Sequence, residues 1–259
     1  MSTGEITMNL TYLEIDTQKS IYRSVTEASN SDFCQRLHLS WLYHDHALEG
    51  VVLTPTDLER AFGGLPPRNY CEGVVYHSLV SLRDAVEFIH ESAARQDELT
   101  MDWLREVHAR VSPPKSECAG RYRKRDSSPG VYHLDVAPAN SISYHFHKFM
   151  DTYRDELSSM HPVRQAAIAH LEFMKVFPFD ERTGVVGRLM MNFILLKNDY
   201  PPALIHARDR HHYFDALNGR REDMVTVVAD AIRSTLGAAR AAGFSEDSNY
   251  GATPRRVAL

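Results

Sequence analysis

Cysteine is scarce in this chain, and long apolar runs are missing. The 259 residues contain three cysteines, Cys34, Cys71 and Cys118, and no two of them form a C-x-x-C pair. An odd, scattered set argues against a disulfide framework and favours a reducing compartment. No stretch approaches the roughly 18 apolar residues of a transmembrane helix, and the N-terminus lacks the basic and apolar regions of a signal peptide. The sequence therefore predicts a cytoplasmic protein without a membrane span.

A strong excess of one charge is also absent. Lysine and arginine number 29 against 34 acidic residues, which gives a formal net charge of -5. This balance gives no reason to expect a nucleic-acid binder or a basic membrane-surface protein. A hydrophobic content of 43% and a charged content of 24% are ordinary for a globular chain. The length allows a substantial core.

Helical periodicity dominates the sequence. In residues 33–50, side chains that suit a buried stripe recur at steps of three and four: Phe33, Leu37, Trp41, His44 and Leu48. Similar patterns predict further helices, including residues 70–94 and 99–111 and most of the chain after residue 142. We find neither an internal repeat nor a linker that would divide the chain into two folded units.

Residues 115–142 are polar and interrupt the helical pattern. Ser-Ser-Pro-Gly at 127–130 is a turn signal, and VYHLDV at 131–136 is the strand-like run of this region. We interpret residues 120–142, approximately, as an exposed flap. The predicted fold class is mostly α with one short β-hairpin flap. The predicted divisions are an N-terminal segment at 1–30, one domain at 31–240 and a loose polar tail at 241–259.

The run VFPFDERTGVVGR at 176–188 has the composition of an anion-binding loop. Thr183 and Gly184 stand before an apolar helix, whose first N–H groups and dipole favour a phosphate. Arg188 lies one turn into that helix, where its guanidinium could clamp a second phosphate oxygen. Glu181 could hold Mg²⁺ beside the phosphates. From the pattern alone, an ordinary helix cap with a surface arginine explains the loop equally well.

The longer run IAHLEFMKVFPFDERTGVVGRLMMNFILLKNDYPP resembles the core of the Fic (filamentation induced by cAMP) family. Members carry His-Pro-Phe-x-Asp/Glu-Gly-Asn-Gly-Arg-x-x-(Gly)-Arg between two helices. This chain retains six of those positions: Pro178, Phe179, Glu181, Gly184, Gly187 and Arg188. AGRYR at 119–123 resembles the approach to the family's flap, and DRHHYFDAL places Tyr213 where the family lines its nucleotide-base pocket. The resemblance covers roughly residues 35 to 235.

The resemblance implies a Fic-type helical bundle that binds ATP or another nucleotide with Mg²⁺ and transfers AMP to a hydroxyl of a target protein. It implies Glu181 as the metal ligand. It also implies nucleotide or phosphate contacts along the motif and one in the later stretch DRHHYFDAL: Arg182, Thr183, Gly184, Gly187, Arg188 and Tyr213. WLYHDHALEGVVLT resembles the family's inhibitory helix, whose motif is Ser/Thr-x-x-x-Glu-Gly. Glu49 and Gly50 match that motif, and the glutamate would pair with Arg188 and block the γ-phosphate of ATP.

Five positions depart from the family pattern. Phe177 stands where the family has the histidine that accepts the proton of the attacking hydroxyl. A phenyl ring cannot act as a general base, and the loss of a positioned base typically costs about 10²- to 10⁴-fold in rate. Thr183 replaces asparagine, Arg182 replaces glycine, and Val185 replaces the first motif arginine. In the inhibitory motif, Asp45 replaces the hydroxyl residue.

Two functions follow from this mixture. In the first, the chain has little or no ordinary AMP-transferase activity, keeps a phosphate-binding loop, and acts as a binding or regulatory module for a small phosphorylated ligand or a protein target. In the second, it is a divergent enzyme that transfers or removes another phosphate-containing group. There Arg182 would restore the charge lost at Val185, and His133, His170 or Asp180 would replace the base. There are simpler interpretations of both histidines. His170 would be a packed core residue, and His133 would be a residue on a strand without a catalytic role.

A third interpretation is a metal-dependent enzyme. Histidines and carboxylates cluster within two turns of the predicted helix 33–50: His44, Asp45, His46 and Glu49. However, His44 and His46 are two residues apart and so point about 200° away from each other. One packed and one exposed histidine explain this pair more simply. The sequence leaves open whether the chain forms a homodimer.

Overall fold

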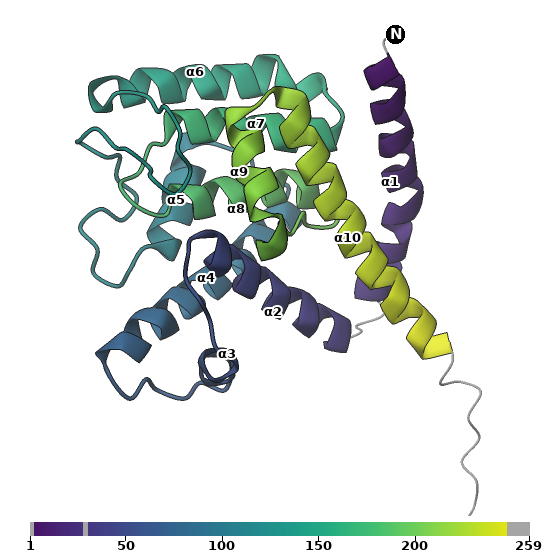
Figure 1. Ribbon diagram of the computed structural model, residues 1–259, viewed down its shortest axis with the longest axis horizontal. Coiled ribbons are helices and arrows are strands. Elements are labelled where there is room, and N and C mark those ends of the chain that lie inside the picture. The colour runs from purple at the N-terminus through teal and green to yellow at the C-terminus, as the bar shows by residue number, and fades with distance from the viewer. Residues whose placement is uncertain (1–2, 28–30, 248–259) are drawn as a thin grey trace, which may run out of the picture.

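The computed structural model describes residues 3–27 and 31–247, and within them regular structure is helical throughout (Figure 1). The α-helices are α1 (Thr3–Glu27), α2 (Ser31–Leu48), α3 (Pro55–Phe62), α4 (Tyr70–Ala94), α5 (Met101–Val111), α6 (Ile142–Asp155), α7 (Pro162–Val176), α8 (Thr183–Lys197), α9 (Arg210–Asn218) and α10 (Arg221–Asp247). Short 3-10 turns lie at η1 (Ala139–Ser141), η2 (Leu157–Ser159) and η3 (Ala207–Asp209). The prediction of a mostly α fold is confirmed.

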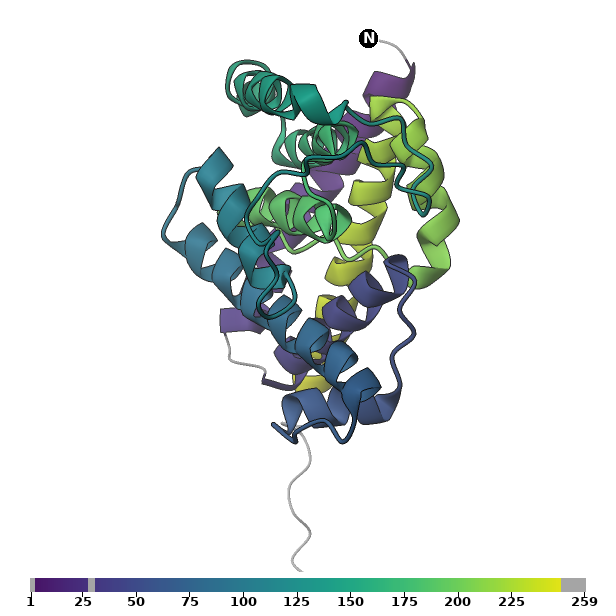
Figure 2. The same cartoon turned by 90° about the vertical axis from the view of Figure 1, so that its left-hand side faces the viewer.

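The core is built around α8, which lies at the centre of the bundle (Figure 2). Its side chains are buried without interruption from Thr183 to Leu195. A helix that is apolar on all sides has to be covered on all sides. Helices α7, α4 and α5 pack directly against it, and α10 and α6 pack against α7. The motif loop joins α7 to α8, so the most buried pair of helices positions it.

The flap is the element where the β-hairpin prediction is wrong. Residues 120–138 form turns and loops, and the described part of the chain contains no strand. The backbone of this region bonds to other partners instead of to a second strand. The Arg123 N–H donates to Pro178 O at 2.9 Å, and the Ala137 N–H donates to Lys175 O at 3.0 Å. The buried Arg123 guanidinium also donates to Phe177 O at 2.7 Å and to Ala137 O. Because the end of α7 and one arginine satisfy these groups, no strand ladder is needed.

The N-terminal segment is a long helix in the structure. Helix α1 lies along α10 over much of its length (Figure 1). Arg233 of α10 donates to Glu14 at 2.8 Å, and Tyr200 donates to Asp16. Helix α10 continues to Asp247, past the predicted domain end at 240, and the remainder of the predicted tail, 248–259, lies outside the described residues. Among the helices described, none combines the length and the apolar character that a bilayer crossing requires.

Candidate phosphate site at the motif loop

Two residues with left-handed backbone conformations shape the motif loop. Phe177 ends α7 with φ of 46°, and its N–H donates to Phe173 O at 3.0 Å. Arg182 has φ of 60° and precedes the first residue of α8. Directly after Arg182, the Thr183 hydroxyl donates to Phe179 O at 3.0 Å and accepts from Phe179 N–H at 3.2 Å. The threonine at the family's asparagine position therefore closes the loop on itself.

His108 of α5 supports the same loop, although no pattern in the sequence pointed to it. Its ring stacks on Phe179 with centroids 3.9 Å apart. Its Nδ1 accepts from Gly120 N–H at 3.0 Å, so Nε2 carries the proton and donates to Glu181 O at 3.2 Å. Burial lowers the pKa of His108 to about 4, with the Glu181 carbonyl and Asp180 opposing the shift. The ring is therefore neutral at pH 7 and positions the loop.

Arg188 is the centre of a buried ion network. Its guanidinium is 3% exposed and lies between the carboxylate of Asp45 on α2 and that of Glu49, one residue beyond the end of α2. Nε donates to Asp45 Oδ1 at 2.5 Å, and Nη2 donates to Glu49 Oε1 at 2.8 Å. The pairing of Glu49 with Arg188 agrees with the inhibitory contact that the family resemblance implies. Asp45 adds a second contact, and its Oδ2 has no partner among the described residues.

A flap tyrosine completes this network. The Tyr132 hydroxyl donates to Glu49 Oε1 and accepts from Arg188 Nη1 at 3.2 Å. Burial raises the pKa of Tyr132 well above its usual value, and Glu49 adds to the shift while Arg188 opposes it. Burial works against the charge of Arg188, but Asp45, Tyr132 and Glu49 hold the pKa of Arg188 well above its usual value. The site therefore contains a permanently charged guanidinium and a neutral phenol.

Behind Arg188, Tyr213 and His170 extend the network into the core. Both side chains are fully buried, and His170 Nε2 lies 2.9 Å from the Tyr213 hydroxyl. Burial, reinforced by the charge of Arg188, lowers the pKa of His170 to about 3. Burial raises the pKa of Tyr213 to about 12 despite Arg188. The packed-core interpretation of His170 is the one that this environment favours.

The N-terminus of α8 is closed by side chains of the protein itself. A Cβ built on Gly184 would lie 1.8 Å from the Tyr132 hydroxyl and 2.8 Å from Glu49 Oε1. Beside Asp45, the structure has two cavities of about 10 Å³ each, which is room for about one water molecule. Ligand pockets usually enclose about 300–1,000 Å³. In this conformation the loop therefore does not admit a nucleotide.

Of the other residues selected from the sequence, three are exposed and one, Arg182, borders an inner cavity. Asp180 and Glu181 are exposed, and the Ser116 hydroxyl donates to Glu181 Oε1 at 3.4 Å. Arg182 is half-buried beside the cavity that Val185 also lines, and it has no ion-pair partner among the described residues. His133 is exposed on the flap, with φ of 51°. Glu181 is therefore free to reach a metal ion, whereas the structure does not gather these four residues into one cluster.

The histidines of α2 diverge, as their spacing predicts. His44 stacks on His206 with centroids 4.3 Å apart, whereas His46 contacts Leu42 O at 2.8 Å and Ser78 Oγ at 2.9 Å. Within residues 3–27 and 31–247, no three histidine, cysteine or acidic side chains are placed to share a metal ion. The α2 cluster that suggested a metal centre consists instead of packing contacts and the Arg188 network.

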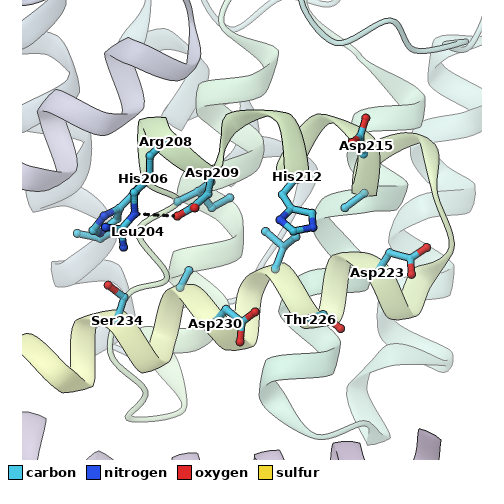
Figure 3. Close-up of a pocket in the computed structure, with 14 residues that line it drawn as sticks. Leu204, His206, Arg208, Asp209, His212, Asp215, Asp223, Thr226, Asp230 and Ser234 are labelled. Carbon is cyan, nitrogen blue, oxygen red and sulfur yellow. Dashed lines mark ion pairs between the residues drawn. The ribbon is translucent and has the colours of Figure 1, made fainter.

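A larger cavity lies elsewhere in the molecule, between η3, α9 and α10. Its volume is about 440 Å³, and Figure 3 shows His212 of α9 facing α10, along which lie Asp223, Asp230 and Ser234. No residue of the motif loop lines it. Tyr213, which the family resemblance assigned to the base pocket, is buried and does not border this cavity.

Comparison with known proteins agrees with this loop and bundle. The family model described as Fic/DOC family matches residues 98–195, which contain the whole motif loop and α8 up to Leu195. The chain belongs to the Fic/DOC family. It is 30% identical over 191 residues to a protein adenylyltransferase Fic of Nematostella vectensis, covering 68% of this chain and 42% of that protein. A protein adenylyltransferase Fic of Drosophila erecta is 23% identical over 248 residues, covering 90% and 49%. This Fic chain thus spans less than half the length of these relatives.

Solved Fic structures share the fold. A Fic domain containing signaling protein from Bacteroides thetaiotaomicron superposes with a TM-score of 0.73 at 19% identity, covering 88% of this chain and 97% of that one. Fic-1 from C. elegans gives a TM-score of 0.75 at 21% identity, covering 93% and 75%. At these identities the likeness concerns the fold. The Fic-type bundle that the motif implied is therefore confirmed.

Proposed function

We propose that this Fic protein is a binding or regulatory module, a pseudoenzyme with little or no ordinary AMP-transferase activity. Phe177 is the observation that carries the proposal. Its left-handed backbone ends α7, and its ring is 6% exposed and packs edge-on against Tyr132. A phenyl ring offers no atom that accepts a proton, so this position does not supply a general base for an attacking hydroxyl.

The environments of the possible substitute bases support the same proposal. His170 is buried behind Arg188, its Nε2 is engaged with Tyr213, and its pKa is lowered to about 3 by burial and by Arg188. A base of that strength is poorly matched to proton abstraction near pH 7. Asp180 is exposed on the outer side of the loop, 3.9 Å from Cys118 Sγ.

The ligand class that we propose is a nucleotide such as ATP, bound with Mg²⁺. The adenylyltransferase names of the curated relatives support a nucleotide. Gly184 and Arg188 are placed to meet phosphate oxygens at the N-terminus of α8, and the exposed Glu181 would hold the metal ion. The closed conformation does not fit that ligand, because Tyr132 and Glu49 fill the space at Gly184. Loading therefore requires the site to open. A protein target would be bound by the module rather than modified by it.

The test is an attempt to make the protein label itself. The wild type and the Glu49→Gly variant are incubated with labelled ATP and Mg²⁺ and analysed by autoradiography and intact mass. We expect no AMP adduct on either, because the variant frees Arg188 from one carboxylate without supplying a base. The positive control is a variant with five substitutions that restore the family pattern and remove the inhibitory glutamate: Glu49→Gly, Phe177→His, Arg182→Gly, Thr183→Asn and Val185→Arg. Efficient labelling of Glu49→Gly with Phe177 in place would refute the proposal.

A divergent enzyme is the second candidate, and Arg182 is the observation that favours it. This arginine has no ion-pair partner among the described residues and borders the cavity next to Val185. It is therefore available to hold a phosphate in place of the missing motif arginine. Incubation with other phosphate-containing donors, compared between wild type and Arg182→Gly, tests this candidate. Transfer or removal of a phosphate-containing group that depends on Arg182 would favour it over the pseudoenzyme.

A further inference from the structure

We propose that the flap residue Tyr132 occupies the phosphate cradle, by which we mean the space at Gly184 and Arg188 in the N-terminal part of α8. Its hydroxyl and a ligand phosphate then compete for Gly184 and Arg188. A phosphorylated ligand then binds only after the flap has moved. This inference rests on the proposed phosphate-binding function and adds the way in which that site is regulated. It goes beyond the contact of Glu49 with Arg188, because it assigns the gate to the flap.

The position of the phenol is the first observation. A Cβ on Gly184 would lie 1.8 Å from the Tyr132 Oη and 2.6 Å from its Cζ. The phenol therefore lies directly against the first turn of α8, where the N–H groups of a helix are unsatisfied within the helix. A phosphate bound to these groups would overlap the tyrosine, so the two occupants exclude each other.

The second observation is that Tyr132 is held from several sides. Its Oη contacts Glu49 and Arg188, and its carbonyl accepts from Asn218 Nδ2 at 3.1 Å. Its ring lies edge-on to Phe177, with centroids 6.2 Å apart, and to Phe214, with centroids 5.3 Å apart. The phenylalanine that replaced the family's base thus has a packing role, since it supports the tyrosine that fills the cradle.

Charge is the third observation. Two carboxylates, Asp45 and Glu49, contact one guanidinium, Arg188, so the cluster carries one net negative charge. A ligand phosphate that is to bind Arg188 therefore has to displace these two carboxylates from the guanidinium. Asp45 stands where the family has a hydroxyl residue, and it therefore favours the closed state by occupying the guanidinium Nε. Phe177 and Asp45, two departures from the family pattern, both stabilise the arrangement that excludes a ligand.

The backbone–backbone hydrogen bonds from the flap to the body of the protein lie at the two ends of the flap. Arg123 and Ala137 anchor its two ends to the end of α7 and the motif loop through backbone and guanidinium hydrogen bonds. Between them, the Tyr132 and His133 N–H groups bond within the flap, to Pro129 O. The polar contacts that hold the tip against the body are made by the Tyr132 side chain and the Asn218 amide, and Leu134 adds apolar packing.

Calorimetry with inorganic pyrophosphate, and with ATP and Mg²⁺, tests the gate on the full chain. We compare wild type with Tyr132→Phe, which keeps the ring, and with Tyr132→Ala, which empties the space. We expect Tyr132→Ala to bind about tenfold or more tightly than wild type, because the closed state no longer competes, and Tyr132→Phe to lie between them. Asn218→Ala, which frees the flap carbonyl, should also strengthen binding. Val131→Ala is the matched control on the exposed neighbour and should behave as wild type.

The outcomes separate the gate from the phosphate site. Equal binding by wild type and Tyr132→Ala would overturn the gate and leave the phosphate site intact. Absence of binding in Tyr132→Ala combined with Asp45→Ser and Glu49→Gly would overturn both. A ligand-free measurement checks the geometry: Gly184→Ala should lower the urea midpoint more in wild type than in Tyr132→Ala, because the added Cβ meets the phenol only when it is present. Equal shifts in the two backgrounds would contradict the close approach of Tyr132 to Gly184.

Discussion

Replacing Arg188 by methionine isolates the energetic role of the buried ion network. Methionine roughly conserves the length of the side chain but removes the charge and every N–H donor. The substitution would leave Asp45, which is 4% exposed, without the guanidinium that now lies 2.5 Å away. Glu49 would lose its 2.8 Å contact and keep the Tyr132 hydroxyl as its partner. The loss of folding stability therefore comes mainly from one buried carboxylate, that of Asp45.

The magnitude follows from the burial of that carboxylate. Removing one partner of a buried ion pair typically costs about 3–5 kcal/mol, because the remaining charge stays out of water. Asp45 Oδ2 already has no partner among the described residues, so the aspartate has few means of compensation. We expect Arg188→Met to lower the free energy of unfolding by about 4 kcal/mol, which corresponds to roughly 10 °C in melting temperature.

Urea unfolding followed by circular dichroism measures this loss. Arg221→Met is the matched control, because Arg221 also contacts two carboxylates but is 37% exposed, and an exposed pair contributes about 1 kcal/mol or less. Adding Asp45→Asn to Arg188→Met should recover about 1–3 kcal/mol, since it removes the orphaned charge. A loss for Arg188→Met no larger than that for Arg221→Met would refute the reasoning.

Three further predictions concern the surroundings of the site. His108 stays neutral in the fold with its pKa lowered to about 4, while the unfolded chain takes up a proton below about pH 6.5, so stability falls by up to about 3 kcal/mol as the pH drops from 6.5 to 4. His108→Phe should flatten this part of the stability–pH profile measured in urea, and an unchanged profile would contradict the assignment. Gly187→Ala should lower the free energy of unfolding by about 1–3 kcal/mol, because the added Cβ would lie 3.0 Å from the His170 ring. Gly237→Ala, with open space around it, should raise the free energy of unfolding by about 0.5–1 kcal/mol. Equal urea midpoints for the two variants would count against this packing. Arg123→Met should cost at least about 2 kcal/mol and accelerate hydrogen exchange at the base of the flap, because buried carbonyls lose a charged donor; unchanged exchange would argue against its anchoring role.

Local signals in the sequence indicated many of the helices after residue 31 and the motif loop, but they did not indicate helix α1 (Thr3–Glu27). Apolar periodicity identified α4, α5, α7 and α8, because a helix has to bury one stripe or, for α8, its whole surface. The spacing of Pro178, Gly184 and Arg188 indicated the Fic family. The pairing of Glu49 with Arg188 also followed from the resemblance. These features lie within short stretches of chain, or belong to a motif whose partners are known in advance.

The flap shows where sequence reasoning was insufficient. VYHLDV has the alternation of a strand, but alternation alone does not supply a second strand with which to pair. The end of α7 and the Arg123 guanidinium satisfy the flap's backbone groups instead. The role of Tyr132 was invisible for the same reason, since no pattern within residues 120–142 specifies that its hydroxyl lies against Gly184.

The sequence by itself determined a helical Fic chain with an anion-type loop and no histidine at the position of the base. Only the tertiary structure decided that Asp45 and Tyr132 join Glu49 in closing the loop. Arg188 meets Glu49 across 139 residues of sequence and Asp45 across 143, while Tyr132 reaches Glu49 across 83. Such contacts depend on how α2, the flap and α8 pack around one buried charge. That packing brings partners from distant parts of the chain to the buried guanidinium and so offsets the free energy of removing its charge from water. No local sequence pattern specifies the packing.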